Sequence, residues 1–221
     1  MVELQQTAGN SGDRVVIITG AGDAFCSGMD LAEPPVPDEL TFMRRVGALC
    51  VLLRGLPKPT IAKVQGPAYG FGANFALCCD LVLAGSSAVS GEIFAERGLS
   101  VDGGGSWTLP RLVGMAKAKE ILFFGARVSA AEAERLGIVN RAVPDGELDS
   151  LCTEWAERLA AGPARALSVM KGLVDTAYES SFAQSIEAEA VSQAFCFGST
   201  EVKEGIRAFA QRRPADFRSV T

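Results

Sequence analysis

The sequence predicts an α/β protein with a helical C-terminal part, and two observations carry that prediction. Up to about residue 140, short β-branched apolar runs alternate with segments whose apolar residues recur at helical spacing. From residue 141 to residue 221 the helical spacing continues without strands. No repeat, low-complexity tract or linker divides the 221 residues. We therefore expect one domain over 1–221, with an α/β body over 1–140 and a helical region over 141–221.

Before residue 94, the body is expected to contain three strands and two helices. The strands are runs rich in Val, Ile and Thr at 13–19, 60–64 and 81–84. The helices follow at 41–54, ending before Gly55, and at 72–79. Three prolines within 31–38 predict a mobile loop.

Residues 94–105 are expected to be irregular, with the run Asp102-Gly-Gly-Gly as a turn. Beyond this turn we expect only helices. One is opened by a capping box at Ser129–Glu132, and the others cover 117–124, 148–161, 164–178, 182–197 and 201–211.

Composition excludes several classes of function. A net charge of −5 argues against a general nucleic-acid partner. No apolar run approaches the roughly 20 residues of a membrane span, and the N-terminus lacks the basic and apolar regions of a secretory signal. The six cysteines form no C-x-x-C and most of them lie in apolar surroundings, which is typical of buried thiols in a reducing cytosol. We expect a cytoplasmic protein with no membrane partner.

The absence of histidine restricts the chemistry. Ser-His-Asp and Cys-His catalysis and His-ligated metal sites are excluded, so acid–base work falls to Asp, Glu, Lys, Tyr or Cys. The phosphate-loop motif is missing, and neither Gly-x-Gly has the third glycine of a dinucleotide site. We expect no metal and no separate cofactor.

Two glycine-rich loops, over 20–30 and 66–74, each follow a predicted strand. Glycine allows backbone N–H groups to face outward and to approach a ligand closely. Two such loops could direct two N–H groups at one oxygen and form an oxyanion hole. The alternative is a pair of tight turns between strand and helix, which are common in α/β proteins.

The loops and three later segments resemble one family in chain order. The first loop segment reads Val-Val-Ile-Ile-Thr-Gly-Ala-Gly-Asp-Ala-Phe-Cys-Ser-Gly-Met-Asp-Leu, and the second reads Pro-Thr-Ile-Ala-Lys-Val-Gln-Gly-Pro-Ala-Tyr-Gly-Phe-Gly-Ala-Asn. These segments resemble the two oxyanion segments of the enoyl-CoA hydratase/isomerase (crotonase) superfamily. Residues 98–114 resemble its catalytic turn and following helix. Residues 129–139 and 201–214 resemble its later signatures.

The resemblance implies a crotonase-like spiral of ββα turns, assembled as a homotrimer or a dimer of trimers. It implies an acyl-CoA thioester as the partner, with coenzyme A as part of the substrate. By position, the oxyanion N–H groups belong to Met29 and Phe71. The substrate pocket then includes the following residues: Gly28, Gly70, Gly72, Asn74 and Phe94. Family members usually carry one more unit before the segment equivalent to Val15, which contacts the CoA nucleotide. Only fourteen residues precede Val15 here, so those contacts are in question.

Hydratases of this family hold water with two glutamates, and those positions fall on Asn74 and Phe94. Asparagine hydrogen-bonds but accepts no proton at neutral pH, and phenylalanine does neither. Glu92 and Glu96 flank Phe94, and a local shift of register could bring one of them inward. Because glutamate is usually exposed, we expect both to face solvent.

The remaining candidate is Asp102, at a turn where several family isomerases carry a catalytic aspartate. Apolar neighbours would raise its pKa and make it a better base. The alternative is an ordinary Asp-Gly turn residue. One carboxylate suffices to move a proton between two carbons, so the residues favour an enoyl-CoA isomerase. Enoyl-CoA hydratase is the first alternative, and a non-catalytic acyl-CoA-binding or assembly subunit is the second.

Overall fold

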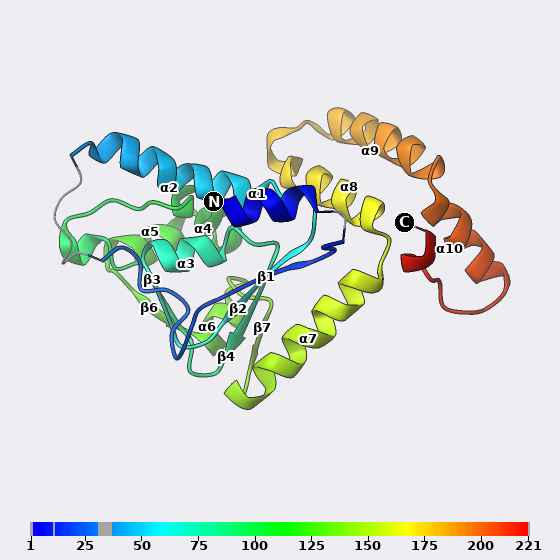
Figure 1. Cartoon of the computed structure of the whole chain (residues 1–221). Helices are drawn as coiled ribbons and strands as arrows, with labels where there is room; N and C mark the ends of the chain where they lie inside the picture. Colours follow the sequence, from blue (N-terminus) through cyan, green and yellow to red (C-terminus); the bar gives the residue numbers. More distant parts are fainter. Residues whose placement is uncertain (1, 11, 31–36, 221) are drawn as a thin grey trace.

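The computed structural model describes residues 2–10, 12–30 and 37–220, and it has a mixed α/β fold (Figure 1). The larger sheet is parallel, with the strand order β1-β2-β4-β7. Its strands are β1 (Val16–Thr19), β2 (Thr60–Val64), β4 (Leu81–Gly85) and β7 (Arg141–Val143). Three of these confirm predicted strands, while β7 was not predicted because three residues are too few for a periodic pattern.

The smaller sheet was not predicted from the sequence. It has the order β3-β5-β6, parallel between β3 and β5 and antiparallel between β5 and β6. The strands are β3 (Pro67–Tyr69), β5 (Val89–Gly91) and β6 (Arg127–Ser129). A parallel bridge from Cys26 to Ala68 brings the first glycine-rich loop to β3. This sheet therefore draws the two loops together.

Helices connect and cover the sheets. They are α1 (Val2–Gly9), α2 (Glu39–Arg54), α3 (Phe71–Ala76), α4 (Gly105–Val113), α5 (Met115–Phe123), α6 (Ala130–Arg135), α7 (Asp145–Ala161), α8 (Ala164–Asp175), α9 (Phe182–Phe197) and α10 (Thr200–Ala210). The predicted helices are confirmed with small changes of their ends, and α1 is an addition. Helix α2 begins before the predicted residue because Asp38 caps it by accepting from the N–H of Thr41. Within the predicted loop over 31–38, residues 31–36 lie outside the described residues.

The central strands of the larger sheet, β2 and β4, are buried on both faces. Ile61 and its neighbour Ala62 on β2 point to opposite faces and are both fully buried. Ile61 packs with Leu148 and Cys152 of α7, whereas Ala62 packs in the main core with Leu53 of α2. Figure 1 shows α7 and α2 on opposite sides of this sheet. Burial on both faces explains why β2 has two consecutive apolar residues, Ile61 and Ala62, rather than a strict alternation of apolar and polar ones.

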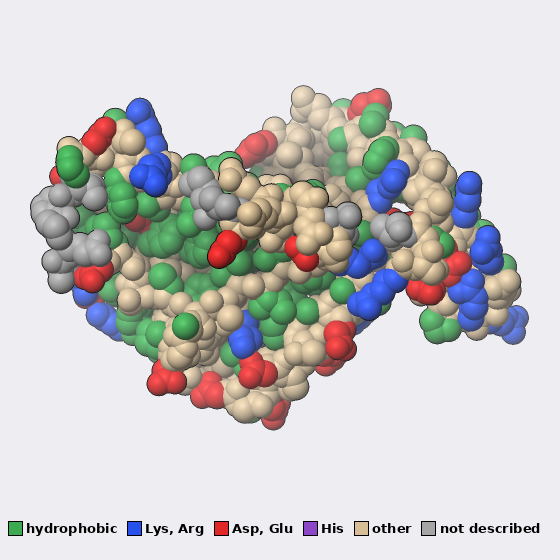
Figure 2. Space-filling model, in the orientation of Figure 1, with side chains coloured by type: hydrophobic (Ala, Val, Ile, Leu, Met, Phe, Trp, Pro, Cys, Tyr) green, Lys and Arg blue, Asp and Glu red, His purple; other side chains and the backbone are tan. Residues whose placement is uncertain are grey.

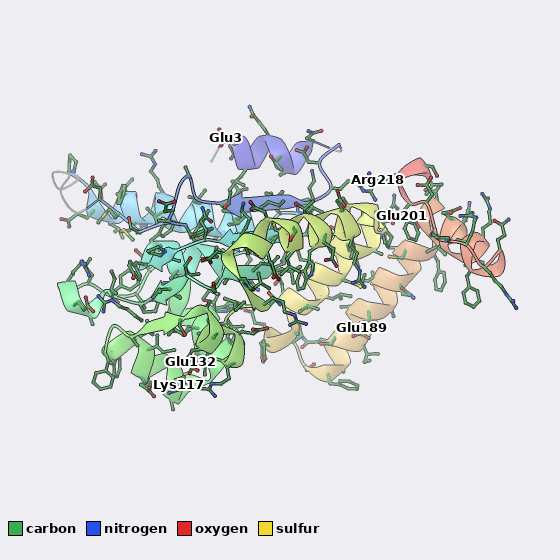
Figure 3. The ribbon with its side chains drawn as sticks, turned by 90° about the horizontal axis from the view of Figure 1, so that it is seen from below. Glu3, Lys117, Glu132, Glu189, Glu201 and Arg218 are labelled. Atoms are coloured by element: carbon green, nitrogen blue, oxygen red, sulfur yellow. The ribbon has the colours of Figure 1, made fainter. Side chains whose placement is uncertain are left out.

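The C-terminal part is helical, and α9 and α10 lie away from both sheets (Figures 1 and 3). These two helices carry large hydrophobic side chains that are exposed, and Figure 2 shows hydrophobic side chains at the surface over α9. The exposed hydrophobic residues of α9 and α10 are Phe182, Ile186, Val191, Phe195, Phe197, Ile206 and Phe209. None of the described helices has the length and apolar character needed to cross a membrane.

Candidate active site

The two glycine-rich loops lie against each other. The N–H of Phe25 donates to the carbonyl of Pro67 at 3.0 Å, and the N–H of Tyr69 donates to the carbonyl of Cys26 at 2.9 Å. A Cβ at Gly72 would overlap the carbonyl of Cys26. Glycine at position 72 is therefore required by the close approach of the loops, and it has no contact with the cavity described below.

Gly28 and Gly70 turn the chain at the point where the loops meet. Both have positive φ, +93° and +53°, which glycine adopts without strain. A Cβ at Gly28 would lie 3.7 Å from the backbone nitrogen of Phe71, so the two turns are neighbours. Neither Met29 nor Phe71 uses its N–H in a turn or loop hydrogen bond among the described residues. Phe71 is the first residue of α3, so no carbonyl of a preceding helical turn accepts a hydrogen bond from its N–H.

A cavity of about 560 Å³ opens in front of these turns. It is lined by Ser27, Gly28, Met29, Asp30, Gly70, Phe71, Ile93, Phe94, Arg97, Leu99 and Asp102. Six of the predicted site residues thus share one cavity, although they come from three separate segments of the chain. Of the remaining two, Gly72 packs between the loops and Asn74 lies behind the cavity wall.

Asp102 reaches the cavity from the turn that precedes α4. The turn is closed by the N–H of Gly105, which donates to the carbonyl of Asp102 at 3.0 Å. Oδ1 of Asp102 is buried and has no hydrogen-bond partner within the described part of the chain. Burial raises the pKa of the Asp102 carboxyl above its usual value, as the apolar neighbours predicted. The group is therefore a stronger base than an exposed aspartate.

Asn74 connects the Asp102 turn to the rest of the site. Its side chain is fully buried, and Nδ2 donates to Oε2 of Glu92 at 3.2 Å and to the carbonyl of Asp102 at 3.0 Å. Its Oδ1 has no partner among the described residues. A Cβ at Gly103 would lie 2.9 Å from Cβ of Asn74, and one at Gly105 would overlap the amide. The glycines after Asp102 therefore make room for Asn74.

The expectation that Glu92 faces solvent is wrong. Glu92 follows strand β5, its side chain turns inward, and only 3% of the residue is exposed. Burial raises the pKa of Glu92 to about 7, the hydrogen bond from Asn74 opposes that rise, and the charge of Asp102 adds to it. Nothing in the local sequence indicates this, because the direction of the side chain is set by the smaller sheet.

Glu96 behaves as expected. It is exposed and forms an ion pair with Arg127 of β6 at 2.6 Å. Phe94, between the two glutamates, is buried, and its ring approaches Gly70. Of the two glutamates beside Phe94, only Glu92 therefore contributes to the site.

The cysteines are free thiols, as predicted, and five of the six are buried. Burial raises the pKa of Cys79 to about 12, so this thiol is not a nucleophile at neutral pH. Among the described residues, no group of three or more His, Cys, Asp or Glu side chains could hold a metal ion.

Comparison with known proteins identifies the family. The family model described as enoyl-CoA hydratase/isomerase matches residues 2–220. A probable enoyl-CoA hydratase of Rhodobacter capsulatus is 35% identical over 92% of this chain and 80% of its own length. The 1,2-epoxyphenylacetyl-CoA isomerase of Escherichia coli is 34% identical over 97% of this chain and 84% of its own. A crystal structure of an enoyl-CoA hydratase from Bacillus anthracis superposes with a TM-score of 0.92 at 30% identity, covering 98% of this chain and 86% of that one.

The fold and site therefore define a crotonase-type protein, and the chain belongs to the enoyl-CoA hydratase/isomerase family. Members of this family bind acyl-CoA thioesters. The family resemblance and the expected α/β class are confirmed.

Proposed function

We propose that this protein is an enoyl-CoA isomerase that moves a proton between two carbons of an acyl-CoA thioester. The backbone N–H groups of Met29 and Phe71 bind the thioester oxygen and stabilise the enolate. Asp102 removes the proton beside the thioester carbonyl and returns it to another carbon. The site requires no metal or separate cofactor in this mechanism, and coenzyme A enters as part of the substrate.

One observation carries the proposal: the half-buried carboxyl of Asp102, whose Oδ1 is buried with no partner in the described chain, lines the same cavity as Met29 and Phe71. Such a carboxyl has a free acceptor oxygen beside the space that a substrate would occupy. Its raised pKa brings it nearer to neutral pH, where a general base is most effective. Gly28, Gly70 and Phe94 complete the wall of the proposed acyl site.

Hydration is the alternative activity within the family, and the relatives' names include both hydratases and an isomerase. Hydration uses two carboxylates that face one water molecule. Asn74 donates to both of its partners and offers no carboxylate, and Phe94 is apolar. This arrangement favours isomerisation. We therefore expect the wild-type protein to hydrate crotonyl-CoA well below about 10 per second, a typical turnover number.

We further propose that the chain forms a homotrimer, or a dimer of trimers, in the cytoplasm. The exposed hydrophobic residues of α9 and α10 support association, because monomers rarely expose large apolar patches. The free cysteines fit a reducing compartment. Sedimentation at micromolar concentration tests the assembly, and a clean monomer would contradict it.

The decisive experiment follows exchange of the α-proton of 2-enoyl- and 3-enoyl-CoA thioesters with deuterated water. Asp102→Asn is nearly isosteric and suits a turn, so we expect it to fold and to bind acyl-CoA. Its exchange rate should fall by a factor of about 10²–10⁴. The matched control is Asp38→Asn, which alters the exposed cap of α2 and should exchange like the wild type.

Two outcomes would contradict the proposal. If Asp102→Asn exchanges the proton as fast as the wild type, Asp102 is only a turn residue. If neither protein exchanges the proton while both bind acyl-CoA, the chain is a non-catalytic acyl-CoA-binding or assembly subunit.

A further inference from the structure

A buried carboxyl, that of Glu92, lies behind the half-buried proposed base. The Asn74 amide links the two, since its Nδ2 donates both to the Glu92 carboxylate and to the backbone carbonyl of Asp102. Both hydrogens of this amide are therefore used. Glu92 is absent from the lining of the cavity, so it acts on the site through its neighbours.

This cluster has more acceptors than donors. Oδ1 of Asn74 and Oδ1 of Asp102 are buried without a donor in the described part of the chain. Buried polar atoms normally have a partner, and leaving one unpaired costs about 1–3 kcal/mol. A proton held by the two carboxyls would supply a donor that the cluster lacks.

The charged surroundings of Glu92 leave Asp102 as its main electrostatic neighbour. Tyr69 of β3 packs on Gly91, next to Glu92. Arg127 of β6 is engaged by Glu96 on the outside. Asn74 of α3 is neutral, and the turn before α4 contributes Asp102. Glu92 is buried and the half-buried Asp102 is its charged neighbour, so the two carboxyls do not both ionise readily. Ionisation of either carboxyl therefore raises the proton affinity of the other.

We propose that Glu92 is a positioning residue for the reaction inferred above. Glu92 holds the Asn74 side chain in place, and Asn74 in turn holds the turn that carries Asp102. Glu92 also gains or loses a proton close to Asp102. When Glu92 releases its proton to water, its negative charge increases the proton affinity of Asp102. Asp102 is then a stronger base. When Asp102 takes the substrate proton, negative charge moves from Asp102 to the thioester oxygen, further from Glu92, and the repulsion from Glu92 therefore favours this step. This inference rests on the proposed function only for its effect on rate.

The first test follows protonation and needs no activity. The carboxyl carbons of ¹³C-labelled glutamate are titrated by NMR in the full-length protein, and Glu92→Gln assigns the Glu92 signal. We expect Glu92 to titrate near pH 7 in the wild type and at lower pH in Asp102→Asn, where the neighbouring charge is absent. Titration in the ordinary glutamate range, near 4.3, or an unchanged midpoint in Asp102→Asn, would overturn the proposal.

The second test is the pH profile of α-proton exchange. We expect the wild-type rate to rise as the pH increases through about 7. The rise should be up to about tenfold, which corresponds to a coupling of one pKa unit between Glu92 and Asp102. Glu92→Gln keeps an acceptor for Asn74 but carries no charge, so its profile should lack this step. Glu96→Gln, on the same segment but exposed, is the control and should keep it. A step that survives in Glu92→Gln would overturn the proposal.

The two tests separate the two hypotheses. If the wild type exchanges no proton, the proposed function fails, and the NMR titration still decides whether Glu92 and Asp102 are coupled. If exchange occurs but Glu92 titrates normally, the function stands and the role of Glu92 is refuted.

Discussion

Two polar clusters in this molecule are built from similar groups and differ in how completely they are hydrogen-bonded. In the first, Oδ2 of Asp80 accepts from the N–H and hydroxyl of Thr60, at 2.7 and 2.9 Å, and from Nζ of Lys171 at 2.9 Å. The N–H of Asp80 donates back to the Thr60 hydroxyl. This cluster pairs its negative charge and ties α8 to the larger sheet.

The second cluster, made of Glu92, Asn74 and Asp102, has two carboxyls, one amide and no cation among the described residues. Two of its oxygens have no donor. The comparison teaches that the first cluster stabilises the fold, whereas the second has oxygen atoms that can still accept a hydrogen bond from a substrate or bind a proton. Such incomplete pairing costs stability and is expected where a site must respond to a ligand.

The largest effect is expected from Asn74→Asp, which replaces the only donor of the second cluster with an acceptor. Both hydrogen bonds of Nδ2 are lost, so the free energy of unfolding should fall by about 4 kcal/mol at pH 8. The loss should shrink at pH 5, where a protonated carboxyl can donate. Urea unfolding at the two pH values measures both effects.

The matched control is Asn140→Asp. Oδ1 of Asn140 accepts from the N–H of Val82 at 2.7 Å, and aspartate keeps that acceptor. Equal losses of stability in the two variants would show that the donor shortage at Asn74 is not the cause.

The next effect is the pH dependence of stability. The pKa of Glu92 is raised to about 7 in the folded protein, so the native state binds more protons than the unfolded state between roughly pH 4.5 and 7. Stability therefore falls as pH rises through this range, by roughly 3 kcal/mol for the whole shift. Denaturation at pH 5, 6, 7 and 8 should show the wild type losing stability relative to Glu92→Gln. Parallel curves would contradict this.

A smaller effect is expected when the paired cluster is broken by Lys171→Met. Removing the cation leaves the Asp80 carboxylate with its two Thr60 bonds, so we expect a loss of about 2 kcal/mol. The rate of α-proton exchange should not change, because Lys171 lies outside the proposed active-site cavity. A loss of exchange without a loss of stability would contradict the division between the two clusters.

The sequence by itself determined the class of fold, three of the four strands of the larger sheet and the helices of the C-terminal part. Apolar runs and caps are local signals: Val and Ile at β2 favour a strand, and Ser181 before α9 favours a helix start. The two glycine-rich loops and Asp102 were also recognisable, because tight turns restrict the residue types that can occupy them.

Only the tertiary structure decided that Glu92 belongs to the site. Its own neighbours in sequence do not distinguish it from Glu96, which lies four positions further along the chain and forms the exposed ion pair with Arg127. The three-residue strands of the smaller sheet are too short to show a period, yet they turn Glu92 towards Asn74 and leave Glu96 outside with Arg127. Burial and charge coupling arise from segments far apart in the chain, so local sequence signals could not reveal them.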